Sequence, residues 1–167
     1  MHIKNASLKV LGQLKSLIEQ LNDKQYAEKS PLLLGGSIGK HTRHVLEFYD
    51  IFIYSYYTGI INYDQRERNE NYEKYREIAI QKIEEICEGV LKIDEDFSII
   101  LEANYSGYNG FVNRIQTSVL RELAHNLEHS IHHMAIIKIA VMHQYPKVDI
   151  GDGFGVAFST LNYEKPQ

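Results

Sequence analysis

Six of the eight histidines lie in two short segments, where their spacing could place several imidazoles around one metal ion. His129 and His133 are four residues apart, so on a helix they project from one face about one turn apart. His41 and His44 are three residues apart near the start of an earlier amphipathic segment. Three imidazoles from two helices would leave an open coordination position, as catalytic zinc sites do.

The apolar pattern of the later segment indicates which histidines face the core. At about 100° per residue, His133 lies at the edge of the apolar arc and His129 lies next to it, whereas His125 and His132 lie toward the rim. A buried imidazole without a partner costs about 1–3 kcal/mol, so a buried cluster indicates a bound ligand. For His41, His125 and His132 taken singly, we prefer an ordinary core histidine bonded to a backbone carbonyl or a tyrosine.

Helical periodicity predicts the elements that position these residues. Ser37 is a good N-cap and Gly59 a good terminator for the helix that carries His44. Segments rich in β-formers flank residues 106–110 and predict a short β-hairpin. We expect a mainly α fold, a four-helix bundle with a short β-hairpin between the third and fourth helices, in one domain spanning 1–167. The predicted helices cover 5–28, 38–58, 71–93 and 118–144, and the predicted strands cover 97–105 and 111–117.

Two segments lack a helical pattern. Residues 62–71 are polar and predict a solvated connection, and residues 145–167 predict an irregular C-terminal tail that packs back through Phe154 and Phe158. The glycine-rich run 151–155 superficially resembles a phosphate loop. It does not lie between a strand and a helix of a βαβ unit, so a turn is the better interpretation.

Composition excludes several classes of protein. The single cysteine, Cys87, rules out a disulfide framework and a cysteine-based zinc cage. A net charge of −4 without a basic block argues against nucleic-acid binding. No apolar stretch approaches about 20 residues and the start has no apolar leader, so we expect a cytoplasmic protein that does not enter a membrane.

The two histidine-bearing segments resemble segments of the DinB-like family of proposed metal-dependent hydrolases. Residues 37–44 (SIGKHTRH) are similar to the signature of the family's second helix, in which a metal-binding histidine follows the serine by seven residues. Residues 128–133 (EHSIHH) are similar to the H-x-x-x-H of its fourth helix. The resemblance implies His44, His129 and His133 as ligands of a divalent metal in a four-helix bundle, often a homodimer. After the second histidine of this motif, many members of the family have Arg-Gly-Gln, whereas this chain has Met134-Ala135-Ile136.

The resemblance and the histidine pattern together predict an enzyme that acts on a small molecule. The metal would activate water or a low-molecular-weight thiol for hydrolysis or thiol transfer. Zinc is the first expectation, with nickel, iron or manganese as alternatives, because imidazole suits several metals. Glu122, two turns before His129, is the candidate catalytic base, and Asn126 is a candidate for orienting a ligand. We expect metal uptake to weaken by about pH 5, below the reference imidazole pKa of about 6.5.

Two alternatives stay open from the sequence. A non-catalytic metal-binding bundle could act as a stress-response or interaction module, because no unambiguous acid–base carboxylate accompanies the histidines. In the other alternative no metal binds, and the histidines are bonded to tyrosines such as Tyr49 and Tyr56.

Overall fold

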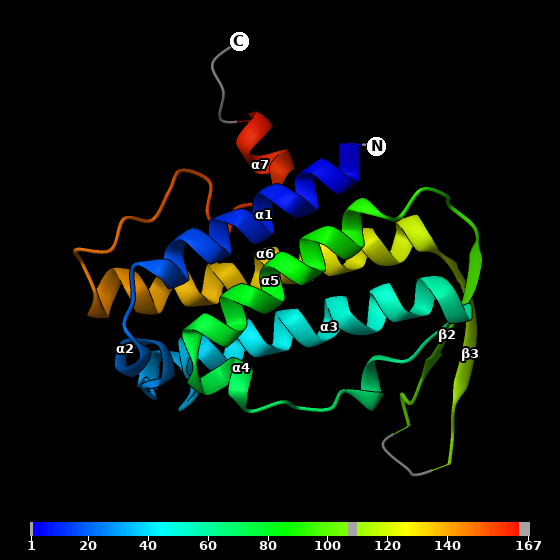
Figure 1. The fold of residues 1–167 in the computed structure, drawn as a ribbon, viewed down its shortest axis with the longest axis horizontal. Coiled ribbons are helices and arrows are strands. Elements are labelled where there is room, and N and C mark those ends of the chain that lie inside the picture. The colour runs from blue at the N-terminus through cyan, green and yellow to red at the C-terminus, as the bar shows by residue number, and fades with distance from the viewer. Residues whose placement is uncertain (1, 107–109, 164–167) are drawn as a thin grey trace.

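The structure, a computed structural model, describes residues 2–106 and 110–163 and is mainly helical with a small three-stranded sheet (Figure 1). In chain order the α-helices and strands are α1 (His2–Glu19), α2 (Asp23–Ala27), α3 (Ile38–Thr58), β1 (Ile60–Ile61), α4 (Asn71–Lys74), α5 (Arg76–Leu91), β2 (Ser98–Ala103), β3 (Asn113–Ser118), α6 (Val119–Gln144) and α7 (Phe158–Tyr163). Two 3-10 turns add η1 (Pro31–Leu33) and η2 (Tyr63–Gln65).

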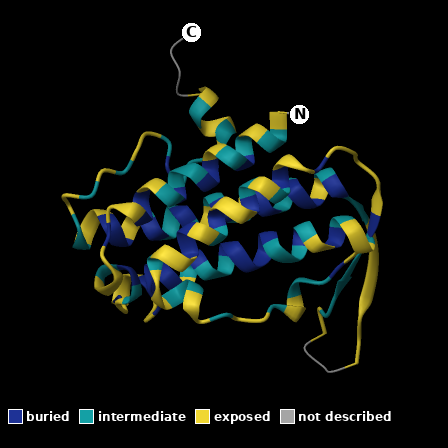
Figure 2. Ribbon diagram, in the orientation of Figure 1, coloured by how far each residue is buried: buried dark blue, intermediate teal, exposed yellow. Residues whose placement is uncertain are grey.

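The four longest helices enclose one hydrophobic core. Helices α1 and α3 each pack against both α5 and α6. Their facing sides carry the buried residues, which Figure 2 shows as dark blue stripes turned toward the neighbouring helices. Burial of this apolar surface is the main force that fixes how the helices cross. The largest fully buried side chains include Tyr26, Tyr49, Phe52, Phe154, Leu11 and Leu14.

The two histidine-bearing helices begin and end where the sequence predicts. The Ser37 side chain accepts a hydrogen bond from the Lys40 backbone N–H at the start of α3, and Gly59 ends that helix with φ +75°. The Ser118 side chain accepts from the Arg121 N–H at the start of α6, which runs unbroken to Gln144. The predictions of 38–58 and 118–144 are confirmed to within one residue.

The other two predicted helices are each interrupted. The helix expected over 5–28 is two helices, because Asn22 and Gln25 form a capping box that starts α2 anew after α1 ends. The helix expected over 71–93 is also two, because Tyr75 adopts extended backbone angles (φ −120°, ψ 106°) between α4 and α5. Helical spacing of apolar residues continues across both breaks and so does not reveal them.

The sheet holds one strand more than the sequence predicts. β2 and β3 pair antiparallel from Ser98 opposite Ser118 to Ala103 opposite Asn113, and part of their predicted turn, 107–109, lies outside the described residues. The added strand, β1, pairs with β2 in parallel, with Ile60 opposite Ile100. The strand lies between the end of α3 and the connection predicted over 62–71, and its two residues are too few to show an alternating pattern in the sequence.

The C-terminal segment packs on the helices as predicted but is not wholly irregular. Phe154 is buried, Phe158 packs against the core, and the unpredicted helix α7 follows the glycine-rich turn. A Cβ on Gly155, where φ is +67°, would lie 2.6 Å from the Ala135 backbone nitrogen, so this turn sits directly on α6. Among the described residues, no helix combines the length and the apolar character needed to cross a membrane.

Gly39 lets α3 approach α4, and replacing it provides a test of this packing. A Cβ at this position would collide with the Glu73 carbonyl oxygen and lie 2.8 Å from Tyr26 Cε1. We expect Gly39→Ala to lower the free energy of unfolding by about 1–3 kcal/mol, measured by urea denaturation. Gly12→Ala in α1 is the control, because nothing lies within 4 Å of its Cβ. There the helix propensity of alanine should add about 0.5–1 kcal/mol, and equal stabilities of the two variants would contradict the described contact.

Candidate metal centre

The packing of α3 against α6 brings together the imidazoles of His44, His129 and His133. The Nε2 atoms of His44 and His129 are 2.9 Å apart, and those of His129 and His133 are 3.2 Å apart. One nitrogen from each of the three rings lies within 4.8 Å of the other two, and all three side chains are half-buried. The ligand set implied by the resemblance is therefore gathered at one point.

The arrangement of these nitrogens suits a metal ion. Two imidazole nitrogens bound to one zinc at the tetrahedral angle lie about 3.4 Å apart, close to the distances found here. A neutral imidazole has one N–H and one lone pair, so three converging nitrogens cannot all satisfy one another by hydrogen bonding. A single cation would accept all three lone pairs at once. His44, His129 and His133 are thus positioned to bind a metal ion.

Burial keeps these histidines in the neutral form that a metal requires. Loss of solvation, followed by the influence of neighbouring histidines, lowers the pKa of His44 and of His129 to about 4. The same causes lower the pKa of His133 to about 3. At neutral pH all three rings are uncharged and their lone pairs are free to coordinate.

Aromatic rings form one wall of the centre. The Phe48 ring stacks on His129 with centroids 4.5 Å apart and lies 4.6 Å from the ring of His44. Tyr63 stacks on Phe48 at 4.6 Å, and the Arg66 guanidinium carbon lies 5.0 Å from the Phe48 centroid. These contacts fix the plane of the His129 ring.

A buried hydrogen-bond network holds Tyr63 against α6. The Tyr63 hydroxyl donates to Glu122 Oε2 at 2.9 Å and accepts from Asn126 Nδ2 at 2.7 Å. Glu122 is fully buried, and its Oε1 accepts from the Thr117 hydroxyl at 2.7 Å. Asn126 therefore orients Tyr63, and its bonds go to Tyr63 and the Glu122 carbonyl. Glu122 has hydroxyl partners on both oxygens, and its assignment as catalytic base stays a prediction.

The connection predicted to be solvated supplies part of the site. Tyr63 and Arg66 are half-buried, and the Arg66 Nη1 donates to the Tyr63 carbonyl oxygen at 2.5 Å. The sequence does not single out either residue, because charged neighbours dominate this run. The signal that could have found them is an aromatic residue, Tyr63, standing alone between polar residues close to the end of the His44 helix.

The remaining clustered histidines have different surroundings. His41 Nδ1 lies 2.9 Å from His133 Nδ1, so the expected carbonyl or tyrosine partner is wrong for this residue. His125 is half-buried with its ring 5.7 Å from that of His129, and His132 is exposed. Throughout the described part of the chain, no hydrogen bond joins a histidine to a tyrosine. The tyrosines proposed in the metal-free alternative therefore do not hold the cluster.

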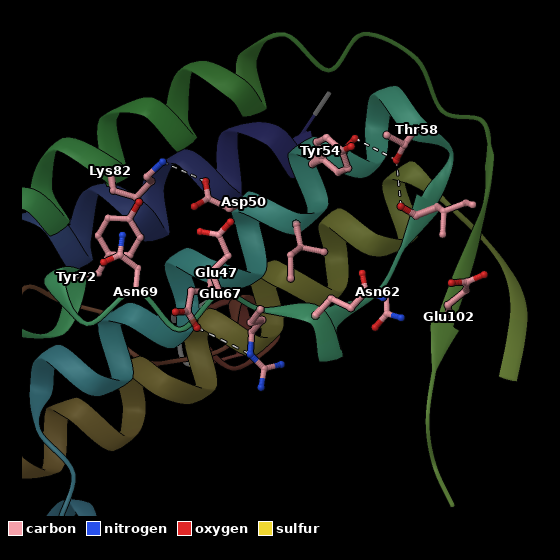
Figure 3. Close-up of a pocket in the computed structure, with 14 residues that line it drawn as sticks. Glu47, Asp50, Tyr54, Thr58, Asn62, Glu67, Asn69, Tyr72, Lys82 and Glu102 are labelled. Carbon is pink, nitrogen blue, oxygen red and sulfur yellow. Dashed lines mark hydrogen bonds and ion pairs between the residues drawn. The ribbon is translucent and has the colours of Figure 1, made fainter. Parts of the chain in front are cut away.

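A cavity of about 630 Å³ lies on a different side of α3, within the size range of ligand pockets (Figure 3). Figure 3 shows Asp50 and Lys82 facing each other on its wall, where their charged atoms are 3.5 Å apart. None of the three clustered ligand histidines lines it. Arg66 belongs to both places, because it lines the cavity and covers Phe48. The cavity is therefore a neighbour of the metal centre and not its mouth.

Part of this chain is similar to a known protein. A protein of Rhizopus delemar named FK506-binding protein 5 is 34% identical to this chain over 111 residues. The match covers 65% of this chain but spans only 28% of the relative's length. No family model matches the chain, and no solved structure does either.

Removing the Tyr63 hydroxyl tests the buried network. Tyr63→Phe keeps the stacked ring but leaves one Glu122 oxygen without its donor. We expect the free energy of unfolding to fall by about 1–3 kcal/mol in urea denaturation. Tyr57→Phe, on an exposed ring of α3, should change it by less than about 0.5 kcal/mol. If both variants were as stable as the parent, the network would carry no stabilisation.

The lowered pKa values change the expected pH dependence of metal uptake. The pKa is about 4 for His44 and His129 and about 3 for His133, so protons compete with the metal only when the pH approaches these values. We expect zinc affinity, measured by isothermal titration calorimetry, to persist through about pH 5 and to fall as pH approaches the pKa of about 4 of His44 and His129. This revises the loss by about pH 5 expected from the reference imidazole pKa.

Folding must be followed in the same experiment. The unfolded chain takes up protons on these residues near pH 6.5 whereas the folded chain does not, so the free energy of unfolding falls as pH drops below that value. Circular dichroism at each pH defines the range in which the protein is folded. Affinity that follows a pKa near 6.5 in a fully folded protein would contradict the burial of the cluster.

Proposed function

We propose that this protein binds a divalent metal, zinc in the first instance, and uses it to activate water or a low-molecular-weight thiol for attack on a small-molecule substrate. The observation that carries the proposal is the convergence of His44, His129 and His133. All three are neutral at physiological pH, and the set leaves coordination positions open to exogenous ligands. A metal in such a site acts as a Lewis acid that lowers the pKa of a bound water or thiol toward neutrality.

We also assign the chain to the DinB-like family as part of this proposal. In that assignment α1, α3, α5 and α6 are the four helices of the bundle, and β2 and β3 form the hairpin between the last two. The ligands come from the second and fourth of these helices, as the resemblance implies. Homodimer formation and a cytoplasmic location belong to the same proposal. FK506 binding does not, because the matched region is a small part of the Rhizopus protein.

The surrounding residues would prepare the site for chemistry. Phe48 and Tyr63 shield one side of His129 from water and hold its ring in place. His44 and His133 meet edge to face, with centroids 4.6 Å apart, so their nitrogens approach the common point from different directions. If Glu122 is the base, the Tyr63 hydroxyl would take up the proton of the nucleophile as its own proton passes to Glu122 Oε2. Among the described residues, the Glu122 carboxylate makes no hydrogen bond to His44, His129 or His133.

A non-catalytic metal-binding module is the second candidate. The observation that favours it is the environment of Glu122, which is fully buried and bonded to two hydroxyl groups. Among the described residues, no aspartate or glutamate belongs to the group of potential metal ligands, which consists of His44, His129 and His133. A metal that only stabilises α3 against α6 would need no such carboxylate.

Metal content tests the site itself. We expect tag-free protein to retain one metal equivalent in elemental analysis and His129→Ala to lose it, because two remaining imidazoles bind much more weakly. His143→Ala, at an exposed position in the last turn of α6, is the control and should keep the parent's content. Equal metal content in the parent and in His129→Ala would contradict the assignment of His129 as a metal ligand.

Turnover separates the two candidates once the metal is established. Metal-loaded protein should hydrolyse at least one member of a panel of activated esters, amides and electrophiles, or transfer a thiol to it. His44→Ala should abolish that activity. If Glu122 moves a proton, Glu122→Gln should lower kcat about 10²–10⁴-fold while metal content is unchanged. Silence across the panel with the metal bound would support the non-catalytic module instead.

A further inference from the structure

His133 has another histidine at each of its two ring nitrogens. Its Nε2 faces His129 Nε2 at 3.2 Å, within the proposed ligand group. Its Nδ1 faces His41 Nδ1 at 2.9 Å on the other side of the ring. The two imidazoles of this second contact are tilted by 44° with centroids 5.2 Å apart, so they meet through their nitrogens and are not stacked.

When a metal is bound, the single proton on each neutral ring determines which of the two histidines donates in this second contact. A neutral imidazole carries one N–H and one lone pair. If His133 Nε2 gives its lone pair to the metal, the proton of that ring must be on Nδ1. The Nδ1 N–H then donates to His41 Nδ1, which must offer its lone pair, and the proton of His41 is on its Nε2. Metal-bound histidines commonly donate their second N–H to such an acceptor, which fixes their tautomer and orientation.

We propose that His41 is a positioning residue that accepts a hydrogen bond from the metal-bound His133 and holds its ring in the coordinating tautomer. This inference rests on the proposed metal site. His41 is not a ligand of the same ion, because it meets His133 at the nitrogen that points away from His129. Helix α3 therefore supplies both a ligand, His44, and, three residues earlier on the same face, the support for a ligand on α6.

The position of His41 is well determined for this task. It lies in the first turn of α3, where the Ser37 side chain caps the helix and the His41 N–H donates to the Ser37 carbonyl oxygen at 3.2 Å. The side chain is half-buried, so its contact with His133 is partly shielded from competing water. A hydrogen bond between two rings in such a setting constrains orientation more strongly than an exposed one would.

Variants at position 41 test the inference by metal affinity. Zn²⁺ affinity is measured by competition with a chromophoric chelator, using His41→Phe, His41→Gln and the parent protein. His41→Phe keeps a ring but cannot accept a hydrogen bond, and we expect it to weaken zinc binding about 10–100-fold. His41→Gln can accept through its amide oxygen and should recover much of that loss. His132→Phe is the matched control, because His132 is exposed, its ring centroid is 5.4 Å from that of His133, and the described part of the chain shows no hydrogen bond between the two.

Cobalt spectra separate support from coordination. Co²⁺ bound to His41→Phe should keep the parent's stoichiometry and visible absorption bands, since all three ligands remain. Lost equivalents or altered bands would make His41 a ligand and overturn the inference. Zinc affinity of His41→Phe equal to that of the parent would overturn it as well. A parent protein that binds neither metal would instead refute the proposed function, and with it this inference.

A measurement on the unaltered protein avoids any dependence on the variants' folding. In the zinc-loaded parent, ¹⁵N–¹H correlation spectra of the histidine rings report which nitrogen carries the proton. We expect His133 protonated on Nδ1 and His41 protonated on Nε2. His133 metal-bound through Nδ1, or His41 protonated on Nδ1, would contradict the hydrogen bond from His133 to His41.

Discussion

The convergence of three imidazole nitrogens where α3 packs against α6 is the constraint on which the rest of the structure depends. His44 comes from one helix, and His129 and His133 come from two successive turns of the other. Their nitrogens meet only if both helices keep their rotation and register. Capping by Ser37 and Ser118 fixes where each helix starts, and the hydrophobic core fixes how they pack. The same burial lowers the pKa of each ring and so maintains the neutral lone pairs.

Support for these rings comes from residues that have no ligand atoms of their own. Phe48 stacks on His129, and Tyr63 stacks on Phe48 while bonding to Glu122 and Asn126. These contacts run from Tyr63 through Phe48 to His129. A change in the connection after α3 can therefore alter the orientation of the His129 ring through these two side chains. This connection is itself anchored by β1, which pairs with β2. The small sheet thus contributes to the candidate metal centre, through β1 at the start of this connection and through Thr117 of β3, which bonds to Glu122.

Sequence reasoning succeeds where one local signal decides the outcome. Ser37, Gly59 and Ser118 mark the ends of the two histidine-bearing helices, and i, i+4 spacing places His129 and His133 together. It fails where continuous periodicity hides a break, as at Asn22 and Tyr75, because caps and single extended residues barely alter an apolar pattern. It also fails for contacts between distant segments. The approach of His41 to His133 and the bonds of Tyr63 to Glu122 and Asn126 depend on how α3, the connection after it and α6 pack.

His44 and His129 are 85 residues apart in the chain, and this separation affects how a metal ion and the folded state depend on each other. An ion held by both would join α3 to α6 and would stabilise the folded state to the extent that the folded chain binds it more tightly than the unfolded chain does. The unfolded chain has only the neighbouring pairs of histidines within each segment, so it would compete weakly for the ion. During synthesis the third ligand emerges only with residue 133, after α3 and α5 have been made. Binding of the ion by all three histidines would therefore have to wait until residue 133 has been made.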